Sequence, residues 1–230
     1  MNLFFTFLTP FLTGIIIIPL LITLSKKTNF LVDIPNGDIL KIHKKNISLL
    51  GGLAIIISVF TGFLFILEEN ILFKIIAISL GLILLFLLGI WDDLKWKHIS
   101  TINPFLKFPL LILFSFIPAL ILFISGISFS FAPISTISIM SSFVYIFIVI
   151  NAINYQDGMD GLSGGLVFIS LVGFILLSLI LGNNFTLIIS LVTLGSVLSF
   201  LIFNFPPAKF FMGDSGAYSL GFILTVLAVS

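Results

Sequence analysis

Cysteine and arginine are both absent from this chain of 230 residues, and charged residues of any kind are scarce. The lack of cysteine excludes disulfides, thiolate metal sites and cysteine nucleophiles. The lack of arginine means that any cationic side chain in contact with a phosphate must belong to a lysine. With 8% charged residues and a net charge of +1, the chain also lacks the basic stripe of a nucleic-acid-binding protein, so no nucleic-acid partner is expected.

Long apolar runs fill most of the sequence. Hydrophobic residues make up 60% of the chain and its mean hydropathy is +1.35, values outside the range of soluble domains. About eight runs have roughly 20 residues each, the length that crosses a ~30 Å hydrocarbon core. They cover residues 3–24, 49–67, 71–91, 104–124, 134–155, 162–181, 185–203 and 217–230. Because the runs are continuous rather than alternating, they predict helices and not barrel strands. The expected fold is all-α: a polytopic integral membrane helix bundle with about eight transmembrane helices, in a single domain over residues 1–230.

The loops between these runs differ in charge according to their position. Nine of the ten lysines lie in or beside the first, third, fifth and seventh loops, and Lys74 is the exception. Residues 1–24 lack a basic leader and a cleavage site, so they are interpreted as a retained span. The positive-inside rule then places the lysine-bearing loops in the cytoplasm and the amino terminus outside. Most acidic residues lie in the same loops, which is typical of an enzyme that works at one membrane face.

A first candidate site lies at the cytoplasmic end of the third run, where Asp92 and Asp93 are adjacent. Two carboxylates beside a hydrocarbon boundary repel each other and lose solvation, so they need a cation or a functional reason. The alternative is a solvated helix end whose acids pair with Lys95 and Lys97. The pair alone does not decide between these interpretations.

A second candidate site runs from Asn151 to Gly161. If the fifth helix continues that far, Asn151, Asn154 and Asp157 recur every three residues and share a face. Asp160 and several glycines follow, and glycine lets a ligand approach the backbone closely. The alternative is a helix end, an Asx-type turn and a capped helix start. Capping explains one aspartate but not a second one without a basic partner, so this stretch is interpreted as functional.

A third candidate site runs from Asn204 to Gly216. A proline pair ends the seventh helix, and residues 213–216 begin the eighth, so Asp214 is either a helix cap or a ligand. The free N–H groups and the positive dipole end of that helix suit a phosphate. Phe211 either packs at the membrane interface or stacks on a base.

The three stretches together supply carboxylate and amide oxygens, and the chain has only two histidines. Hard oxygen ligands of this kind favour Mg²⁺, or Mn²⁺, over Zn²⁺. Magnesium is usually held by one or two carboxylates together with substrate phosphates, and lysines on the same face supply further positive charge. The pattern therefore predicts phosphate chemistry on a lipid-anchored substrate.

In this order and spacing the three stretches resemble the polyprenyl-phosphate N-acetylhexosamine-1-phosphate transferase family. That family includes the phospho-MurNAc-pentapeptide translocase and the transferases that begin O-antigen, enterobacterial common antigen and teichoic acid synthesis. The stretch from Asp33 to Gly52 also resembles the family's first cytoplasmic loop and second helix. The resemblance implies an enzyme of the bacterial cytoplasmic membrane that transfers a phospho-N-acetylhexosamine from a UDP-sugar to polyprenyl (undecaprenyl) phosphate and releases UMP. A homodimer is left open.

The resemblance also implies a role for each candidate residue. The catalytic set has four aspartates. Asp92 and Asp93 orient or deprotonate the lipid phosphate, and Asp157 and Asp160 hold the nucleotide or organise the loop. The metal set, for Mg²⁺, is Asn154 and Asp214. The substrate-binding set comprises phosphate-binding lysines, two amides and an aromatic ring for uracil: Lys44, Lys45, Lys95, Lys97, Asn151, Asn204 and Phe211.

Two features depart from the family pattern. Residues 37–41 replace a common Arg-Lys pair, and the usual proline before the glycine pair at Gly51 is missing. The chain also ends inside the eighth run, whereas the family continues with further helices and a His-rich loop. Two alternatives follow: an inactive or partner-dependent truncated relative, and a divalent-cation transporter. A transporter places ionisable residues near the bilayer midplane, and no Asp, Glu or Lys lies mid-span within the predicted boundaries.

Overall fold

The computed structural model describes residues 3–33, 46–66, 69–96, 104–129 and 134–230. In these ranges the chain forms long apolar helices and one small hairpin sheet, so the predicted all-α membrane bundle is confirmed. The elements in chain order are α1 Leu3–Thr28, β1 Val32–Asp33, β2 Ile47–Ser48, α2 Gly51–Phe63, α3 Glu69–Trp96, α4 Pro104–Ile124, α5 Ser135–Gln156, α6 Leu162–Leu181, α7 Asn184–Asn204 and α8 Gly213–Val229.

The helices correspond to the predicted runs, but they are less uniform in length. In the described ranges six helices are long and apolar enough to cross a membrane, while α2 and α8 are shorter. Helix α2 begins only at Gly51, because Ile47 and Ser48 before it pair with β1 in an antiparallel sheet. Helices α1 and α3 continue past their apolar runs, to Thr28 and Trp96. Polar residues that were expected in loops therefore lie on helices, where the helical repeat decides which way they point.

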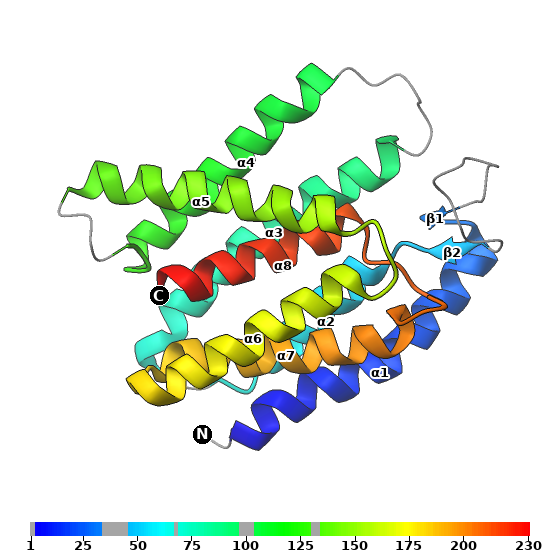
Figure 1. Cartoon of the computed structure of the whole chain (residues 1–230), viewed down its shortest axis with the longest axis horizontal. Helices are drawn as coiled ribbons and strands as arrows, with labels where there is room; N and C mark the ends of the chain where they lie inside the picture. The colour runs from blue at the N-terminus through cyan, green and yellow to red at the C-terminus, as the bar shows by residue number, and fades with distance from the viewer. Residues whose placement is uncertain (1–2, 34–45, 67–68, 97–103, 130–133) are drawn as a thin grey trace.

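Successive helices run in alternating directions, so the loops between them lie alternately at the two ends of the bundle (Figure 1). The β1–β2 hairpin lies at the same end as the carboxyl ends of α1, α3, α5 and α7. We call this the polar end, because it contains all three candidate sites. Both chain termini lie toward the opposite end.

Helices α7 and α8 form the centre of the bundle. In α7, 78% of the most apolar window is buried, against 22–39% in the other long helices. Almost every residue of α8 is buried as well. Helices α1, α2 and α6 pack against α7, and α2, α3 and α5 pack against α8. On the outside, large apolar side chains such as Ile16 and Ile180 stay exposed, as expected where helices contact lipid.

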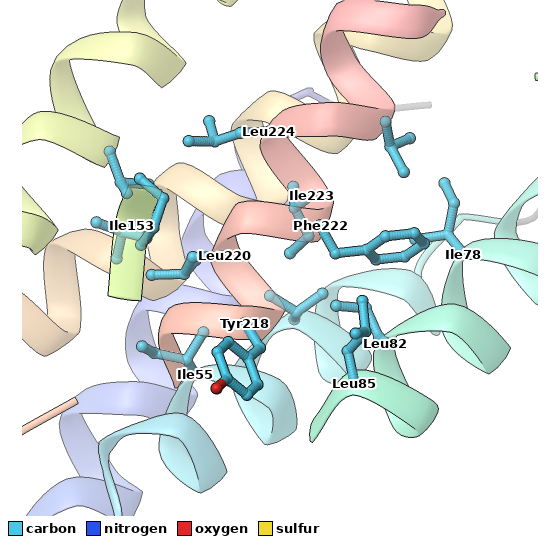
Figure 2. Close-up of a cluster of buried hydrophobic side chains, with 14 of the residues drawn as sticks. Ile55, Ile78, Leu82, Leu85, Ile153, Tyr218, Leu220, Phe222, Ile223 and Leu224 are labelled. Carbon is cyan, nitrogen blue, oxygen red and sulfur yellow. The ribbon is translucent and has the colours of Figure 1, made fainter. Parts of the chain in front are cut away.

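The core around α8 is built from aliphatic and aromatic side chains of several helices. Figure 2 shows Tyr218 and Phe222 of α8 against Ile78, Leu82 and Leu85 of α3. All five side chains are fully buried. The Tyr218 hydroxyl is the one oxygen drawn in this otherwise apolar cluster, and a phenol in such surroundings needs a hydrogen-bond partner.

Glycines allow the central helices to approach one another closely. A Cβ atom added at Gly195 of α7 would lie 2.3 Å from the carbonyl oxygen of Phe7 in α1. The atom that blocks it belongs to a backbone, so the helix would have to move rather than a side chain. Small residues at interhelical contacts serve the same purpose in other membrane bundles.

Gly195→Ala should therefore lower the thermal stability of the purified protein in detergent. Overpacking of this kind typically costs about 1–3 kcal/mol, because α1 and α7 must separate. The control is Gly173→Ala in α6, where nothing lies within 4 Å of the added Cβ. Melting can be followed by the loss of the monodisperse size-exclusion peak on heating. Equal melting temperatures for the two variants would contradict the close α1–α7 contact.

Candidate functional site

Asp92 and Asp93 lie inside the last turns of α3 and point into the bundle. Asp92 is 1% exposed and Asp93 is 7% exposed. The alternative interpretation, in which the two acids lie at a solvated helix end, is therefore wrong. Lys95 does not pair with them: its ammonium lies 4.5 Å from the centre of the Trp91 ring, on an exposed part of the helix. The role of Lys95 in phosphate binding stays a prediction. Lys44, Lys45 and Lys97 lie outside the described residues.

Asp93 bonds to the backbone at the start of α8. Its Oδ1 accepts a hydrogen bond from the Asp214 N–H at 2.9 Å, and its Oδ2 accepts one from the Ser215 N–H at 3.1 Å. Gly213 has a left-handed φ of 71°, which turns the chain into the helix at a position where glycine is favoured. Two of the N–H groups that were expected to be free for a phosphate are therefore occupied by the carboxylate of Asp93.

Asp92 bonds to two side chains instead. The Tyr218 hydroxyl donates to Asp92 Oδ2 at 2.6 Å, and Lys107 Nζ lies 2.6 Å from the same oxygen. Within the described ranges, Asp92 Oδ1 is buried and has no hydrogen-bond partner. Buried carboxylate oxygens are nearly always bonded, so an unpaired one marks a place for a proton, a water or a ligand.

Lys107 joins Asp92 to Asp214. Its ammonium lies 3.6 Å from Asp214 Oδ2 as well as 2.6 Å from Asp92, so the two carboxylates are close neighbours. The other oxygen of Asp214 accepts a hydrogen bond of 2.6 Å from Asn154 Nδ2. The Asp92 side chain is almost fully buried, but those of Lys107 and Asp214 are 27% and 29% exposed. A ligand can therefore reach these two groups.

The sequence reasoning missed Lys107 and Tyr218, although both carry a signal. Lys107 is a charged residue within the predicted span 104–124, and an ionisable residue within a span is a candidate for a functional role. Tyr218 is one of three tyrosines beside 28 phenylalanines, so its hydroxyl is unusual in this composition. Neither feature predicts which residue is the partner. Tyr218 bonds to Asp92, which is 126 residues away in the sequence, and Lys107 pairs with Asp92 on another helix.

The two asparagine side chains of α5 bond to different partners, one in the site and one within α5. Helix α5 includes Asn151 and Asn154, as predicted, but it ends at Gln156, so Asp157 lies just outside the predicted helical face. Asn154 reaches Asp214, whereas Asn151 Nδ2 donates to the Phe147 carbonyl within α5 at 2.7 Å. The role of Asn151 in substrate binding stays a prediction.

Asp157 is half-buried just beyond the end of α5. Burial raises the pKa of Asp157 to about 7, and the negative charge of Asp93 contributes in the same direction. An acid with a raised pKa keeps its proton at low pH and becomes a carboxylate as the pH rises through this value. Near neutral pH the charge of Asp157 therefore responds to any cation that arrives beside it.

Asp160 and Asn204 tie two loops of the polar end together. Asp160 Oδ2 accepts a hydrogen bond from the Ala208 N–H at 2.9 Å. Asn204 Oδ1 accepts one from the Gly161 N–H at 3.0 Å, and its Nδ2 donates to the Phe210 carbonyl at 2.8 Å. These bonds fasten the α5–α6 connection to the α7–α8 connection. Direct contacts of Asp160 and Asn204 with a nucleotide or sugar stay predictions.

Phe211 lies on the α7–α8 connection beside the β1–β2 hairpin. Its N–H donates to the Ser48 carbonyl at 2.8 Å, and its carbonyl accepts from the Gly51 N–H at 3.0 Å. The backbone is therefore held by two hydrogen bonds, and the side chain is partly exposed. Stacking of this ring on a base is not tested by the geometry and stays a prediction.

The predicted Mg²⁺ ligands, Asn154 and Asp214, lie together, with Nδ2 of Asn154 on the Asp214 carboxylate; Mg²⁺ binding by these two residues and substrate phosphates stays a prediction. In the described part of the chain, no group of three or more His, Asp or Glu side chains is arranged to hold a metal ion. A complete protein cage is also not how Mg²⁺ usually binds, because it retains waters and takes phosphate oxygens. Asp214 offers a partly exposed carboxylate and Asn154 an amide in contact with it.

The Lys107 bridge leads to a test by a double-mutant cycle. Lys107→Met should destabilise the protein, because Asp92 then keeps a buried charge without its cation. The cost should fall below the roughly 3–5 kcal/mol of a fully buried pair, since Lys107 is 27% exposed. Combining it with Asp92→Asn should show a coupling energy of about 1–3 kcal/mol in SDS-induced unfolding.

Lys74→Met provides the matched lysine control at the start of α3, where the Lys74 ammonium lies 5.0 Å from the Phe185 ring centre. Its effect should add to that of Asp92→Asn without coupling. Additive effects for Lys107→Met and Asp92→Asn as well would show that the bridge contributes nothing to stability.

Comparison with known proteins gives a consistent family. The sequence profile of Glycosyl transferase family 4 matches residues 75–230. A Bacillus subtilis protein named probable undecaprenyl-phosphate N-acetylglucosaminyl 1-phosphate transferase is 32% identical over 97% of this chain and 61% of its own length. A phospho-N-acetylmuramoyl-pentapeptide-transferase from Staphylococcus carnosus is 30% identical over 95% of this chain and 73% of its own length.

A protein of the same name from Dictyoglomus thermophilum is 39% identical over 81% of this chain and 60% of its own length. The chain thus spans about three fifths of the length of two of these relatives and nearly three quarters of the third. The matched residues include Asp92, Lys107, Asn154 and Asp214. This chain belongs to glycosyl transferase family 4.

Proposed function

We propose that this protein transfers a phospho-N-acetylhexosamine from a UDP-sugar to polyprenyl phosphate at the cytoplasmic face of a bacterial membrane. The observation that carries the proposal is the cluster of Asp92, Lys107, Asn154 and Asp214 at the polar end of a membrane bundle. The names of the relatives support a phospho-sugar donor and an undecaprenyl acceptor. Both substrates bring phosphates, and one of them is anchored in the membrane.

The reaction exchanges one phosphoanhydride bond for another. An oxygen of the lipid phosphate attacks the β-phosphorus of the UDP-sugar and forms the new P–O bond. The bond from that phosphorus to the bridging oxygen breaks, and UMP leaves with the electron pair. Phosphate monoesters have a second pKa near 6, so much of the acceptor is already dianionic at neutral pH, and a strong general base is not essential.

Charge is the main obstacle to this reaction at the observed site. Asp92 and Asp214 share the ammonium of Lys107, and a third carboxylate, that of Asp93, lies beside Asp214 on its backbone amide. The cluster is therefore negative, and it repels a diphosphate unless further positive charge is present. A bound Mg²⁺, held by Asn154 and Asp214, would supply that charge and polarise the phosphate oxygens.

The residues of this chain supply positioning for the remaining steps. Lys107 is accessible enough to contact an incoming phosphate while it stays bound to Asp92. Asp157 and Asp160 lie on the connection that would face the nucleotide, and Phe211 would stack on uracil. Lys44, Lys45, Lys95 and Lys97 would meet phosphates from the surrounding loops. Holding reactants in line accounts for most of the acceleration in phosphoryl transfer.

The alternative of a divalent-cation transporter finds less support in the fold. Asp92 and Asp93 lie near the end of α3, and Asp214 lies in the first turn of α8, at the polar end of the bundle. Transporters of this type hold their ions near the bilayer midplane. An inactive relative remains the second alternative, and the assay below separates it from an enzyme.

The proposed activity is tested by UMP release from UDP-N-acetylglucosamine or UDP-MurNAc-pentapeptide in detergent micelles. Release should require polyprenyl phosphate and Mg²⁺ together with the protein, expressed with whatever coding sequence follows Ser230. Asp214→Asn should reduce the rate by at least about a hundredfold, because the change removes charge from the transition-state site with little change in volume. Lys74→Met, near the start of α3, removes one charge at the opposite end and should leave the rate unchanged. Turnover in the presence of excess EDTA, or near-normal activity in Asp214→Asn, would refute the metal-assisted mechanism.

The proposed orientation predicts which cysteines are labelled in intact cells. Because the chain has no cysteine, a single introduced thiol reports one position. Lys209 and Asn184 are exposed and flank opposite ends of α7. Asn184→Cys should react with a membrane-impermeant maleimide from outside, and Lys209→Cys should react only after lysis. The reverse pattern would place the site on the side away from the cell's nucleotide sugars.

A further inference from the structure

The adjacent acids Asp92 and Asp93 bond to different kinds of partner. Both carboxylate oxygens of Asp93 are used by backbone N–H groups, those of Asp214 and Ser215. The first amides of a helix have no partner within the helix, and a carboxylate that accepts two of them also interacts favourably with the helix dipole. Asp93 is 7% exposed, so these bonds form out of water.

Two glycines provide the space for this cap. Gly89 lies one turn before Asp93 on the same face of α3, and a Cβ added to it would lie 2.3 Å from Ser215 Cα. A Cβ added at Gly213 would lie 2.8 Å from Asp93 Oδ2. Side chains at either position would therefore push α3 away from the first turn of α8, and Asp93 would lose its reach.

Asp92 has the opposite pattern. Its bonded oxygen contacts side chains, Tyr218 and Lys107, and its other oxygen has no partner among the described residues. Lys107 in turn contacts Asp214, whose own N–H is held by Asp93. The position of Asp214 thus depends on Asp93 through the backbone, and on Asp92 only through Lys107.

We propose that Asp93 is a positioning residue: it caps α8 and thereby holds the Asp214 carboxylate against Asn154 and Lys107, while the buried Asp92 acts on the site through its contact with Lys107. The assignment of a cation to Asp214 rests on the proposed function, but the cap itself does not. The two carboxylates, adjacent and of the same type, have different tasks because successive residues of a helix point about 100° apart.

Hydrogen exchange measured by mass spectrometry tests the cap without substrate or metal. Asp93→Asn retains one acceptor oxygen, so it can keep only one of the two amide bonds, and its NH₂ group faces the other N–H. We expect exchange at the Asp214 and Ser215 amides to accelerate by roughly tenfold, the loss typical of a helix cap. Asp160→Asn is the matched control: it should affect the Ala208 amide, its partner, and leave the start of α8 unchanged.

A second variant leaves the Asp93 carboxylate in place. Gly213→Ala introduces a side chain at a left-handed φ of 71° and a Cβ in contact with Asp93 Oδ2. It should accelerate the same two amides. Protection of these amides unchanged in both variants would overturn the proposal.

Turnover as a function of Mg²⁺ tests the positioning role. In Asp93→Asn and Gly213→Ala, the Mg²⁺ concentration for half-maximal UMP release should rise about tenfold, and excess Mg²⁺ should recover most of the rate. In Asp92→Asn the rate should stay low at saturating Mg²⁺. If Asp93→Asn loses its rate at every Mg²⁺ concentration while Gly213→Ala behaves normally, Asp93 acts directly on substrate and the proposal fails. Absence of UMP release from the unaltered protein would refute the proposed function instead, and hydrogen exchange would still decide whether Asp93 caps α8.

Discussion

The ammonium of Lys107 is the contact on which the polar end depends. It lies between Asp92 and Asp214, which come from helices more than a hundred residues apart in the sequence. Without it, the Asp92 and Asp214 carboxylates would keep only the hydrogen bonds from Tyr218 and Asn154, and a buried charge that loses its cation is strongly destabilising. With it, the cluster still has an excess of negative charge. The same contact that joins α3 to α8 therefore leaves a negatively charged cluster, where the proposed cation and phosphates would bind.

A second set of bonds holds the loops around this cluster. The N–H groups of Gly51 and Gly52, at the start of α2, donate to the Phe211 and Met212 carbonyls. The start of α2 is therefore tied to the segment that leads into α8, and β2 lies beside it through the Ser48–Phe210 bridge. Asp160 and Asn204 tie the α5–α6 connection to the same segment. Backbone N–H and C=O groups that are buried away from water need partners within the protein, and here several of the partners are other parts of the site.

Much of the fold was predictable because membrane insertion imposes a simple rule on sequence. The runs at 162–181 and 185–203 correspond to α6 and α7 almost residue for residue. Helix boundaries next to polar residues were predicted less accurately: α3 extends to Trp96 and α8 begins at Gly213. A helix can continue past its apolar run when its polar residues find partners within the protein. Hydropathy also does not show which helix is central, because α6 and α7 are similarly apolar while only α7 is mostly buried.

The sequence by itself determined the class of the molecule: an all-helical membrane protein whose acids, amides and most lysines gather at one end, with the oxygen ligands of phosphate chemistry. Each of these properties depends on residue type and on local spacing. The tertiary structure alone decided how the acids divide their tasks. Asp92 and Asp93 are identical in type and adjacent in sequence, yet one meets Lys107 and Tyr218 and the other meets two backbone amides. That difference arises from the packing of α3 against α8 at Gly89 and Gly213, and contacts between helices so far apart in the chain leave no local pattern in the sequence.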